Sequence, residues 1–187
     1  MNSRKFFDLL RRTPPAAAAK KIKIRDVAVL VGDSSGFTRK THRYGILRFL
    51  SVMTRCYDRL IPILRRRRGK VLSHDADDIL AVFDDASDAV EAAVEMNRWL
   101  RNHNRGRSDA DRFNVCIGIH FGPVVYLSDD VYGDAVNVAC KIGEELADKD
   151  EILVTRAVHD RTNRGVYART AEIGGRVFEL FLIRGGR

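Results

Sequence analysis

The chain has 187 residues, of which 45% are hydrophobic and 31% are charged. This balance is typical of one soluble globular domain with a full core and excludes a disordered chain. No apolar run approaches the ~18–20 residues of a membrane helix and no signal-peptide core follows the N-terminus, so we expect a cytoplasmic protein without an integral membrane segment. The net charge of +8 indicates an anionic partner, such as a nucleic acid, a phosphate ligand or a membrane surface.

The first 24 residues differ from the rest of the chain. The stretch MNSRKFFDLLRR has the pattern of a short basic amphipathic helix, and TPPAAAAKK then breaks and links it. We therefore predict an N-terminal basic arm or linker over residues 1–24, used for packing or for dimer contacts. A single folded domain is expected over residues 25–187.

From residue 27 onward the apolar spacing alternates between strand and helix. VAVLVGD is a valine-rich strand that ends at a glycine turn, and helical spacing follows from about residue 39 to 64. The later elements are expected to be two strands around a tight acidic turn (70–83), a helix (88–104), a glycine-broken strand region (113–127), a helix (134–148), a strand (151–155) and a hairpin closing at Gly174-Gly175. The order β-α-β-β-α-β, with an added αβ unit and a C-terminal hairpin, predicts an α+β fold with a ferredoxin-like core.

Acidic residues gather at two points of this expected core. Asp33 follows the first strand in VLVGDSSGFT, and Asp75, Asp77 and Asp78 crowd the turn in SHDADDIL. Taken alone, acidic residues at either position serve more often in a turn or as a helix cap than as metal ligands. Together, carboxylates on adjacent central strands can bind two divalent cations, which suits phosphoryl transfer. Hard oxygen ligands favour Mg²⁺ or Mn²⁺ over zinc.

The turn SSGFT, residues 34–38, follows Asp33 directly and opens the next expected helix. Backbone amides at a helix N-terminus can bind phosphate oxygens, because the positive end of the helix dipole points at them. We therefore expect Phe37 and Thr38 to belong to a substrate-binding site for phosphate groups.

Five sequence blocks stand in a fixed order: DSSGFT (33–38), ADDILAVF (76–83), IGIHFG (117–122), VYGDAVNVACK (131–141) and EILVT (151–155). In these blocks the chain resembles the catalytic domains of class III nucleotidyl cyclases, over roughly residues 26–185. The resemblance implies that residues 25–187 form a cyclase catalytic domain. Such an enzyme converts a nucleoside triphosphate into a 3′,5′-cyclic nucleotide and pyrophosphate.

The family pattern also selects among the acids of the turn. It places the family's Gly-Asp pair so that Asp77 is implied as a metal ligand together with Asp33, helped by the carbonyl of Ser34. The implied cofactor is Mg²⁺ or Mn²⁺, with two ions in each site. Strand alternation is expected to point the flanking Asp75 and Asp78 to the opposite face.

In class III cyclases the active site forms between two protomers, so the resemblance implies a homodimer with shared sites. Asn137 matches the family asparagine that orients the ribose, and Asp130 matches the base-reading position. Lys141 stands where the family has a transition-state arginine, so it keeps the charge but loses the bidentate fork. Arg176, in the closing hairpin, is a further candidate for the terminal phosphates.

The base-reading pair departs from the purine pattern. Ser73 stands where adenylate cyclases carry a lysine, while Asp130 remains. In this respect and in its size the chain looks like the Pycsar anti-phage enzymes, which make cyclic CMP or cyclic UMP. We therefore expect a pyrimidine cyclase that produces a second messenger in anti-phage defence. An aromatic such as Tyr44 could fill the gap beside a smaller base, although ordinary packing also accounts for it.

Three alternatives remain at this point. The chain could be a purine cyclase with an altered base pocket, or a catalytically weak homologue that acts as a dimeric regulator. The intact Asp33, Asp77 and Asn137 argue against the weak homologue. An RNA-binding module shares the ferredoxin-like core, but here the central strands carry acids where such a module displays aromatics, so no nucleic-acid partner is expected.

Overall fold

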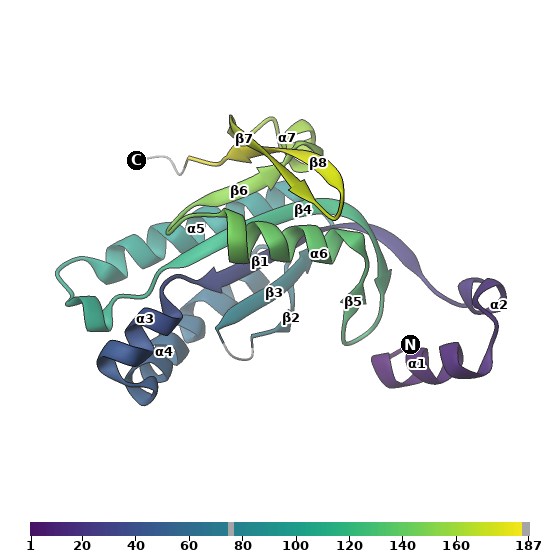
Figure 1. The fold of residues 1–187 in the computed structure, drawn as a ribbon, viewed down its shortest axis with the longest axis horizontal. Coiled ribbons are helices and arrows are strands. Elements are labelled where there is room, and N and C mark those ends of the chain that lie inside the picture. The colour runs from purple at the N-terminus through teal and green to yellow at the C-terminus, as the bar shows by residue number, and fades with distance from the viewer. Residues whose placement is uncertain (75–76, 185–187) are drawn as a thin grey trace.

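A computed structural model describes residues 1–74 and 77–184. Within these residues eight strands form one sheet in the order β2-β3-β1-β4-β6-β8-β7, and β5 pairs with β4 (Figure 1). The strands are β1 (Ile24–Ser34), β2 (Lys70–Ser73), β3 (Asp78–Phe83), β4 (Val115–Tyr126), β5 (Val131–Tyr132), β6 (Ile152–Thr155), β7 (Val166–Ile173) and β8 (Arg176–Leu182). The four strands β2-β3-β1-β4 are antiparallel neighbours, as a ferredoxin-like core requires, which confirms the predicted α+β fold.

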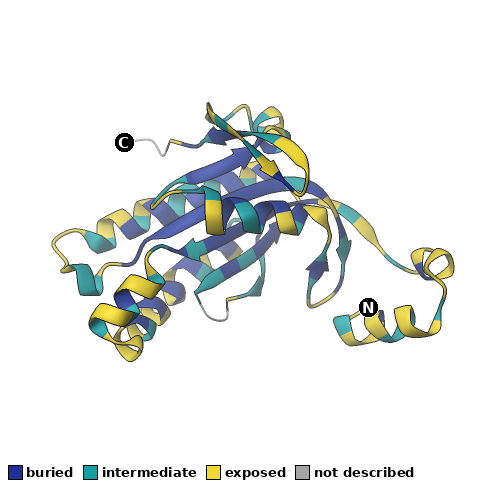
Figure 2. Cartoon of the chain, in the orientation of Figure 1, coloured by how far each residue is buried: buried dark blue, intermediate teal, exposed yellow. Residues whose placement is uncertain are grey.

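Helices cover both faces of the sheet. Helices α4 (Ile46–Arg66) and α5 (Ala86–Asn104) cover one face, and α6 (Asp134–Lys141) covers the other (Figure 1). Side chains alternate along β1, so Leu30 packs into the core beneath α4 and α5 while Val31 packs with α6. The central strands are accordingly buried along most of their length (Figure 2).

The long helix expected over residues 39–64 is two helices. Helix α3 (Phe37–Tyr44) ends at Gly45, and α4 begins at the next residue. Gly45 has a φ of 85°, a left-handed value that interrupts a right-handed helix and that glycine adopts without steric cost. The apolar spacing that predicted the helix starts only at Ile46, and the polar stretch 39–44 before it gave no boundary of its own, so one helix was expected where there are two.

The helix expected over residues 134–148 is shorter and irregular. Helix α6 ends at Lys141, and a π-helical turn, η2 (Ile142–Leu146), continues it. Gly143 in this turn lies against the backbone of β1, so a Cβ there would come within 3.0 Å of the carbonyl oxygen of Val31. The turn therefore brings its neighbours close to the end of β1.

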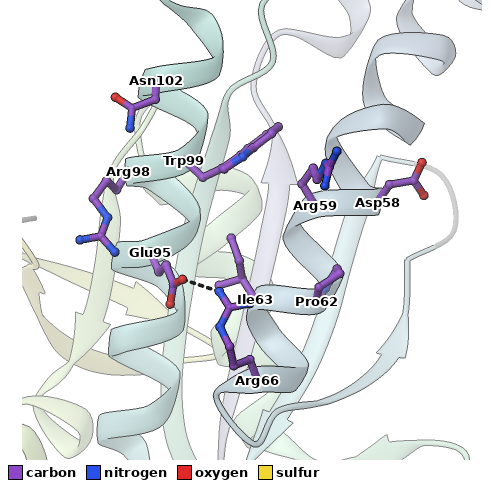
Figure 3. Close-up of a pocket in the computed structure, with 9 residues that line it drawn as sticks. All are labelled: Asp58, Arg59, Pro62, Ile63, Arg66, Glu95, Arg98, Trp99 and Asn102. Atoms are coloured by element: carbon purple, nitrogen blue, oxygen red, sulfur yellow. Dashed lines mark hydrogen bonds and ion pairs between the residues drawn. The ribbon is translucent and has the colours of Figure 1, made fainter.

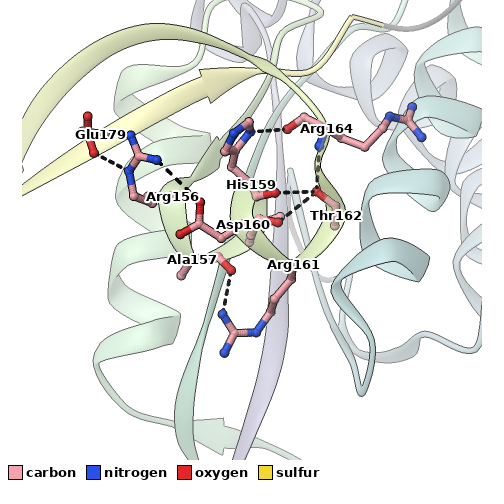
Figure 4. A network of polar contacts seen from close by, with 9 residues as sticks. Arg156, Ala157, His159, Asp160, Arg161, Thr162, Arg164 and Glu179 are labelled. Atoms are coloured by element: carbon pink, nitrogen blue, oxygen red, sulfur yellow. Dashed lines mark hydrogen bonds and ion pairs between the residues drawn. The ribbon is translucent and has the colours of Figure 1, made fainter.

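Helix α7 (Arg156–Thr162) was not predicted from the sequence. It follows β6 without a loop and ends at Asn163, which has a left-handed φ of 51°. Ion pairs tie it down. Arg156 lies 2.5 Å from Glu179 of β8 (Figure 4), and Arg164, two residues after the helix, lies 2.5 Å from Glu91 of α5. These contacts are long-range, so the local pattern does not carry them.

The N-terminal arm contains the predicted basic helix. Helices α1 (Ser3–Arg12) and α2 (Pro15–Ala19) project from the sheet beside β5 (Figure 1). Phe6 of α1 is buried and stacks on Tyr132 with ring centroids 5.8 Å apart. The amide of Ser3 donates to Asp129 at 2.8 Å. The arm therefore rests on the loop between β4 and β5.

Across the described residues, no helix combines the length and the apolar character that crossing a bilayer requires.

Candidate active site

Asp33 is the acid at the end of the central strand β1. It pairs with Asp78 of β3 on one side and with Cys116 of β4 on the other, and its side chain is half-buried. Burial and, next, the charge of Asp77 raise the pKa of Asp33 to about 7, and Glu144 and Asp78 add to the rise. A carboxylate crowded in this way favours a nearby cation.

Asp77 is held against the same strand end by Ser34. The amide of Ser34 donates to the carbonyl oxygen of Asp77 at 3.0 Å, and the Ser34 hydroxyl donates to the Asp77 carboxylate at 3.3 Å. Ser34 is itself buried, so this tether is fixed within the fold. The structure thus brings together Asp33, Ser34 and Asp77, which the sequence predicted as one group.

Asp78 corrects one expectation. We expected strand alternation to point it away from the site, but the register places it directly opposite Asp33. Opposite residues of an antiparallel pair point to the same face of the sheet. Asp78 therefore adds a third carboxylate on the face that carries Asp33. Asp75 lies outside the described residues.

Glu144 is a neighbour of the site that sequence reasoning missed. It lies on the π-helical turn after α6, and burial followed by the charge of Asp78 raises its pKa. Its charge also helps to raise the pKa of Asp33. The acidic pair Glu144-Glu145 was visible in the sequence, but a regular helix gives no reason to aim it at β1.

The turn after Asp33 has the form expected of a phosphate-binding helix start. Gly36 adopts a left-handed φ of 82°, and no side chain caps the first turn of α3. Phe37 anchors the turn, because its ring meets Phe49 edge-on with centroids 5.0 Å apart. Thr38 is exposed. The first-turn amides are therefore free of side-chain caps and next to the paired carboxylates.

The donor set fits a hard divalent cation. Among the described residues no three histidines, cysteines, aspartates or glutamates form a ready-made metal cage. Asp33 and Asp77 supply two carboxylates, which matches Mg²⁺ or Mn²⁺, since these ions commonly take one or two carboxylates together with water and substrate phosphates. Because an added cation offsets the repulsion between the carboxylates, these residues fit the implied metal.

Asn137 and Lys141 lie four residues apart on α6, on the same side of the helix. Asn137 is exposed, and Lys141 pairs with Glu145 one turn further on. Among the described residues neither forms a hydrogen bond or an ion pair with Asp33 or Asp77 of the same chain. Arg176 pairs with Asp134 at the start of α6, 2.6 Å away.

The proposed base-reading residues lie on separate elements. Asp130 accepts from the amide of Val131 at 2.8 Å, in the loop where α1 docks. Ser73 is half-buried next to a bulge at the end of β2. The Tyr44 hydroxyl donates to Asp109 at 3.1 Å, so this tyrosine has a polar partner of its own. In the part of the chain that the structure describes, no hydrogen bond joins any two of these three residues.

Known proteins resemble the chain in sequence. The model of the family described as adenylate and guanylate cyclase catalytic domain matches residues 20–177. An adenylate cyclase of Anabaena cylindrica is 31% identical over an alignment of 137 positions that covers 63% of this chain and 27% of that protein. The chain spans only 18% to 39% of the length of the curated relatives it matches.

Solved structures resemble the chain in fold. An adenylate/guanylate cyclase/hydrolase from Silicibacter pomeroyi superposes with a TM-score of 0.76 at 24% identity, covering 87% of this chain and 98% of that one. The adenylyl cyclase CyaB from P. aeruginosa gives 0.77 at 16% identity, covering 89% and 97%. At these identities the likeness shows the fold alone, while the family match covers most of the sequence. The chain therefore belongs to the family of adenylate and guanylate cyclase catalytic domains.

Proposed function

We propose that the chain is a nucleotide cyclase that converts a nucleoside triphosphate into a 3′,5′-cyclic nucleotide and pyrophosphate. The observation that carries the proposal is the tethered pair Asp33 and Asp77, held together through Ser34 at the end of β1. The raised pKa of Asp33 supports it, because unpaired carboxylates are costly to bring together and a substrate-bound cation relieves that cost.

The residues of the chain have separate tasks in this reaction. Asp33 and Asp77 would hold Mg²⁺ or Mn²⁺, two ions in each site, which when bound lower the pKa of the ribose 3′-hydroxyl and offset charge on the leaving pyrophosphate. The first-turn amides of α3, at Phe37 and Thr38, hold phosphate oxygens. Asn137 orients the ribose.

Lys141 stabilises the negative charge that develops on the phosphates in the transition state. As a single ammonium group it binds one oxygen where an arginine would bind two. Its present partner is Glu145, and this exposed pair costs little to separate because surface ion pairs are weak.

Two protomers complete the site in this proposal. Among the described residues, Asn137 and Lys141 form no hydrogen bond or ion pair with the carboxylates of their own chain. A homodimer that presents α6 of one protomer to β1 of the other would supply both halves. Each dimer then holds two equivalent sites, as two-fold symmetry requires.

We propose that the base is a pyrimidine, from UTP or CTP, and that the cyclic product is a second messenger in anti-phage defence. Ser73 and Asp130 support a base pocket without the adenine-reading lysine. Both are short side chains that can bond a base edge, and the serine hydroxyl both donates and accepts. Two of the relatives are named adenylate cyclases. ATP is therefore the alternative substrate to UTP and CTP.

Purified protein with Mn²⁺ and each of ATP, GTP, CTP and UTP, with products identified by mass, tests the proposal. Cyclic UMP or cyclic CMP should predominate. Predominant cyclic AMP would refute the pyrimidine assignment and leave the cyclase assignment intact, whereas no cyclic product from any of the four would refute both.

The metal ligands are tested by substitution. Asp33→Asn and Asp77→Asn should each lower turnover by at least about 100-fold, because each removes a charge that the cations need. Asp84→Asn is the matched control, since Asp84 follows the same strand β3 but pairs with Arg25 at 2.7 Å. It should retain wild-type turnover. Full activity in Asp77→Asn would remove Asp77 from the mechanism.

A further inference from the structure

A basic trough lies between α4 and α5, on the outer surface of the helices (Figure 3). It consists of two adjoining pockets of about 330 Å³ and 560 Å³, which share Asp58, Arg59 and Trp99. Such volumes lie in the range of small-molecule sites. We call it the arginine trough, after Arg55, Arg59, Arg66, Arg98 and Arg107 that line it.

The trough is separate from the proposed active site. Helices α4 and α5 cover the face of the sheet on which Leu30 packs, whereas Asp33 extends the face of Val31, which packs with α6. A ligand in the trough therefore contacts none of the residues assigned to catalysis.

Most of the positive charge in the trough is not neutralised. Arg66 pairs with Glu95 at 2.5 Å, but among the described residues neither Arg59 nor Arg98 has a hydrogen bond or an ion pair. Arg55 donates only to the neutral hydroxyl of Ser51, at 2.8 Å, and its charge stays unpaired.

The carboxylates beside the trough do not change this balance. Asp111 is already paired with Arg48 at 2.9 Å and accepts from the Ser108 hydroxyl. Asp58 is left as the one acid without an ion pair among the described lining residues, against Arg55, Arg59 and Arg98, which also have none. The uncompensated charge of the trough is therefore positive.

The lowered pKa of His103 is consistent with the positive charge of the trough. His103 lines the trough, and its pKa is lowered by burial first and then by the charges of Arg107 and Arg55. Arg107 donates to the backbone carbonyl of His103 at 2.7 Å, so its position is fixed. Positive charge concentrated at a partly enclosed surface favours anions.

Trp99 adds a flat aromatic surface. Its indole stacks on the ring of His103 with centroids 4.8 Å apart and planes at 23°. It projects from α5 across the trough towards Arg59 of α4 (Figure 3). Unpaired guanidinium groups beside an indole are the combination that binds a phosphate together with a planar ring.

We infer that the arginine trough binds a mononucleotide, with the phosphate on Arg59 and Arg98 and the base against Trp99. The inference does not rest on the proposed cyclase activity, because it uses neither the carboxylates nor the metal. It places a nucleotide site on the face of the sheet opposite to the carboxylates.

Trp99 itself reports the test, because it is the one tryptophan of the sequence. Its fluorescence is followed while UMP or AMP is added to the Asp77→Asn protein in EDTA, conditions that remove the metal from the proposed active site. Saturable quenching is expected. Ribose 5-phosphate, which lacks the base, should bind about tenfold more weakly, since one stacked base contributes about 1–3 kcal/mol.

The double variant Arg59→Gln/Arg98→Gln should weaken UMP binding by at least about tenfold, because two charge-assisted contacts are lost. Both side chains are exposed, so the variant should keep the wild-type circular dichroism spectrum. Arg101→Gln is the matched control, an exposed arginine on the same helix outside the trough, and should bind as the parent does.

Three outcomes would overturn the inference. They are no saturable quenching, equal affinity in the Arg59→Gln/Arg98→Gln variant, and equal quenching by sulfate at the same ionic strength. Equal affinity for ribose 5-phosphate and UMP would show that the base does not contribute to binding and would contradict its contact with Trp99. Loss of cyclase activity in the other experiments would leave the binding result untouched.

Discussion

At the scale of single residues, His120 is a buried histidine in a setting that opposes its protonation. It lies on β4, its Nδ1 is 2.8 Å from the hydroxyl of Thr155, and Phe178 packs edge-on against its ring. Burial is the largest cause that lowers its pKa, to about 4, and the charges of Arg176 and Arg161 contribute. The folded chain therefore keeps this side chain neutral.

His120 predicts how stability depends on pH. The unfolded chain protonates this histidine near pH 6.5 and the folded chain near pH 4, so between these values the unfolded state binds more protons. The contribution of His120 to the free energy of unfolding is on the order of 3 kcal/mol. It is fully present above pH 6.5 and is lost as the pH falls towards 4. Urea titrations at several pH values should show a smaller loss in His120→Gln than in the wild type.

His42→Gln provides the control for this experiment, because His42 is exposed on α3. It should lose as much stability as the wild type over the same pH range. Equal pH dependence in His120→Gln and the wild type would contradict the assignment.

The residues of the site differ in how far the sequence could predict them. Asp33, Ser34 and Asp77 belong to two short local motifs, and the structure brings them together. Asp78 and Glu144 were misjudged or missed because their positions depend on pairing register and on a distorted helix turn. Such features arise from tertiary contacts, which local patterns do not encode.

At the scale of elements, the contact between β4 and the end of α6 depends on missing side chains. A Cβ on Gly118 would lie 2.5 Å from the amide nitrogen of Gly143 and would also collide with the carbonyl of Ala139. Both obstacles are backbone atoms, which cannot rotate away. This close approach sets the position of the π-helical turn, and with it Glu144.

Gly118→Ala should therefore destabilise the fold by about 2–3 kcal/mol or more, because α6 must move away from the strand. Gly32→Ala is the comparison, since a Cβ there meets only side-chain atoms at 3.9 Å and beyond. It should change the free energy of unfolding much less. Chemical denaturation of the two variants measures the difference. Similar losses of stability would show that the close backbone contact at Gly118 does not exclude a Cβ there.

The elements themselves were predicted unevenly. The hairpin β2-β3, the helix α5 and the pair β7-β8 follow from local alternation and turn residues. The break at Gly45 and the short helix α7 do not. Gly45 follows a polar stretch without apolar periodicity, and α7 is fixed by ion pairs to distant elements.

At the scale of the whole molecule, the net charge of +8 is partly explained by the surface of α4 and α5. The arginine trough lies on that side, and the proposed active site lies on the side of α6. The two sheet faces thus carry different chemistry. The ferredoxin-like core followed from the βαββαβ succession, while nothing in the local pattern indicated that two helices would leave a trough between them.

The proposed shared site predicts recovery of activity by mixing. Asp77→Asn and Asn137→Ala homodimers should each be inactive, because each lacks one half of every site. Subunit exchange should restore about a quarter of wild-type turnover, since half of the dimers are mixed and each mixed dimer has one intact site. The same mixture with Asp33→Asn in place of Asn137→Ala is the control and should stay inactive, because both changes then affect the same half. No recovery would contradict a site shared between protomers.

The docking of α1 has a practical consequence for making the protein. The carbonyl oxygen of Met1 accepts from the amide of Ser128 at 3.0 Å, two residues from Asp130. A purification tag fused before Met1 would crowd the loop that carries the proposed base-reading residue, and measurements of substrate preference would then report on the tag as well. A tag at the other end of the chain joins it beyond β8, which among the described residues pairs with β6 and β7 and not with β5 or the loop before it.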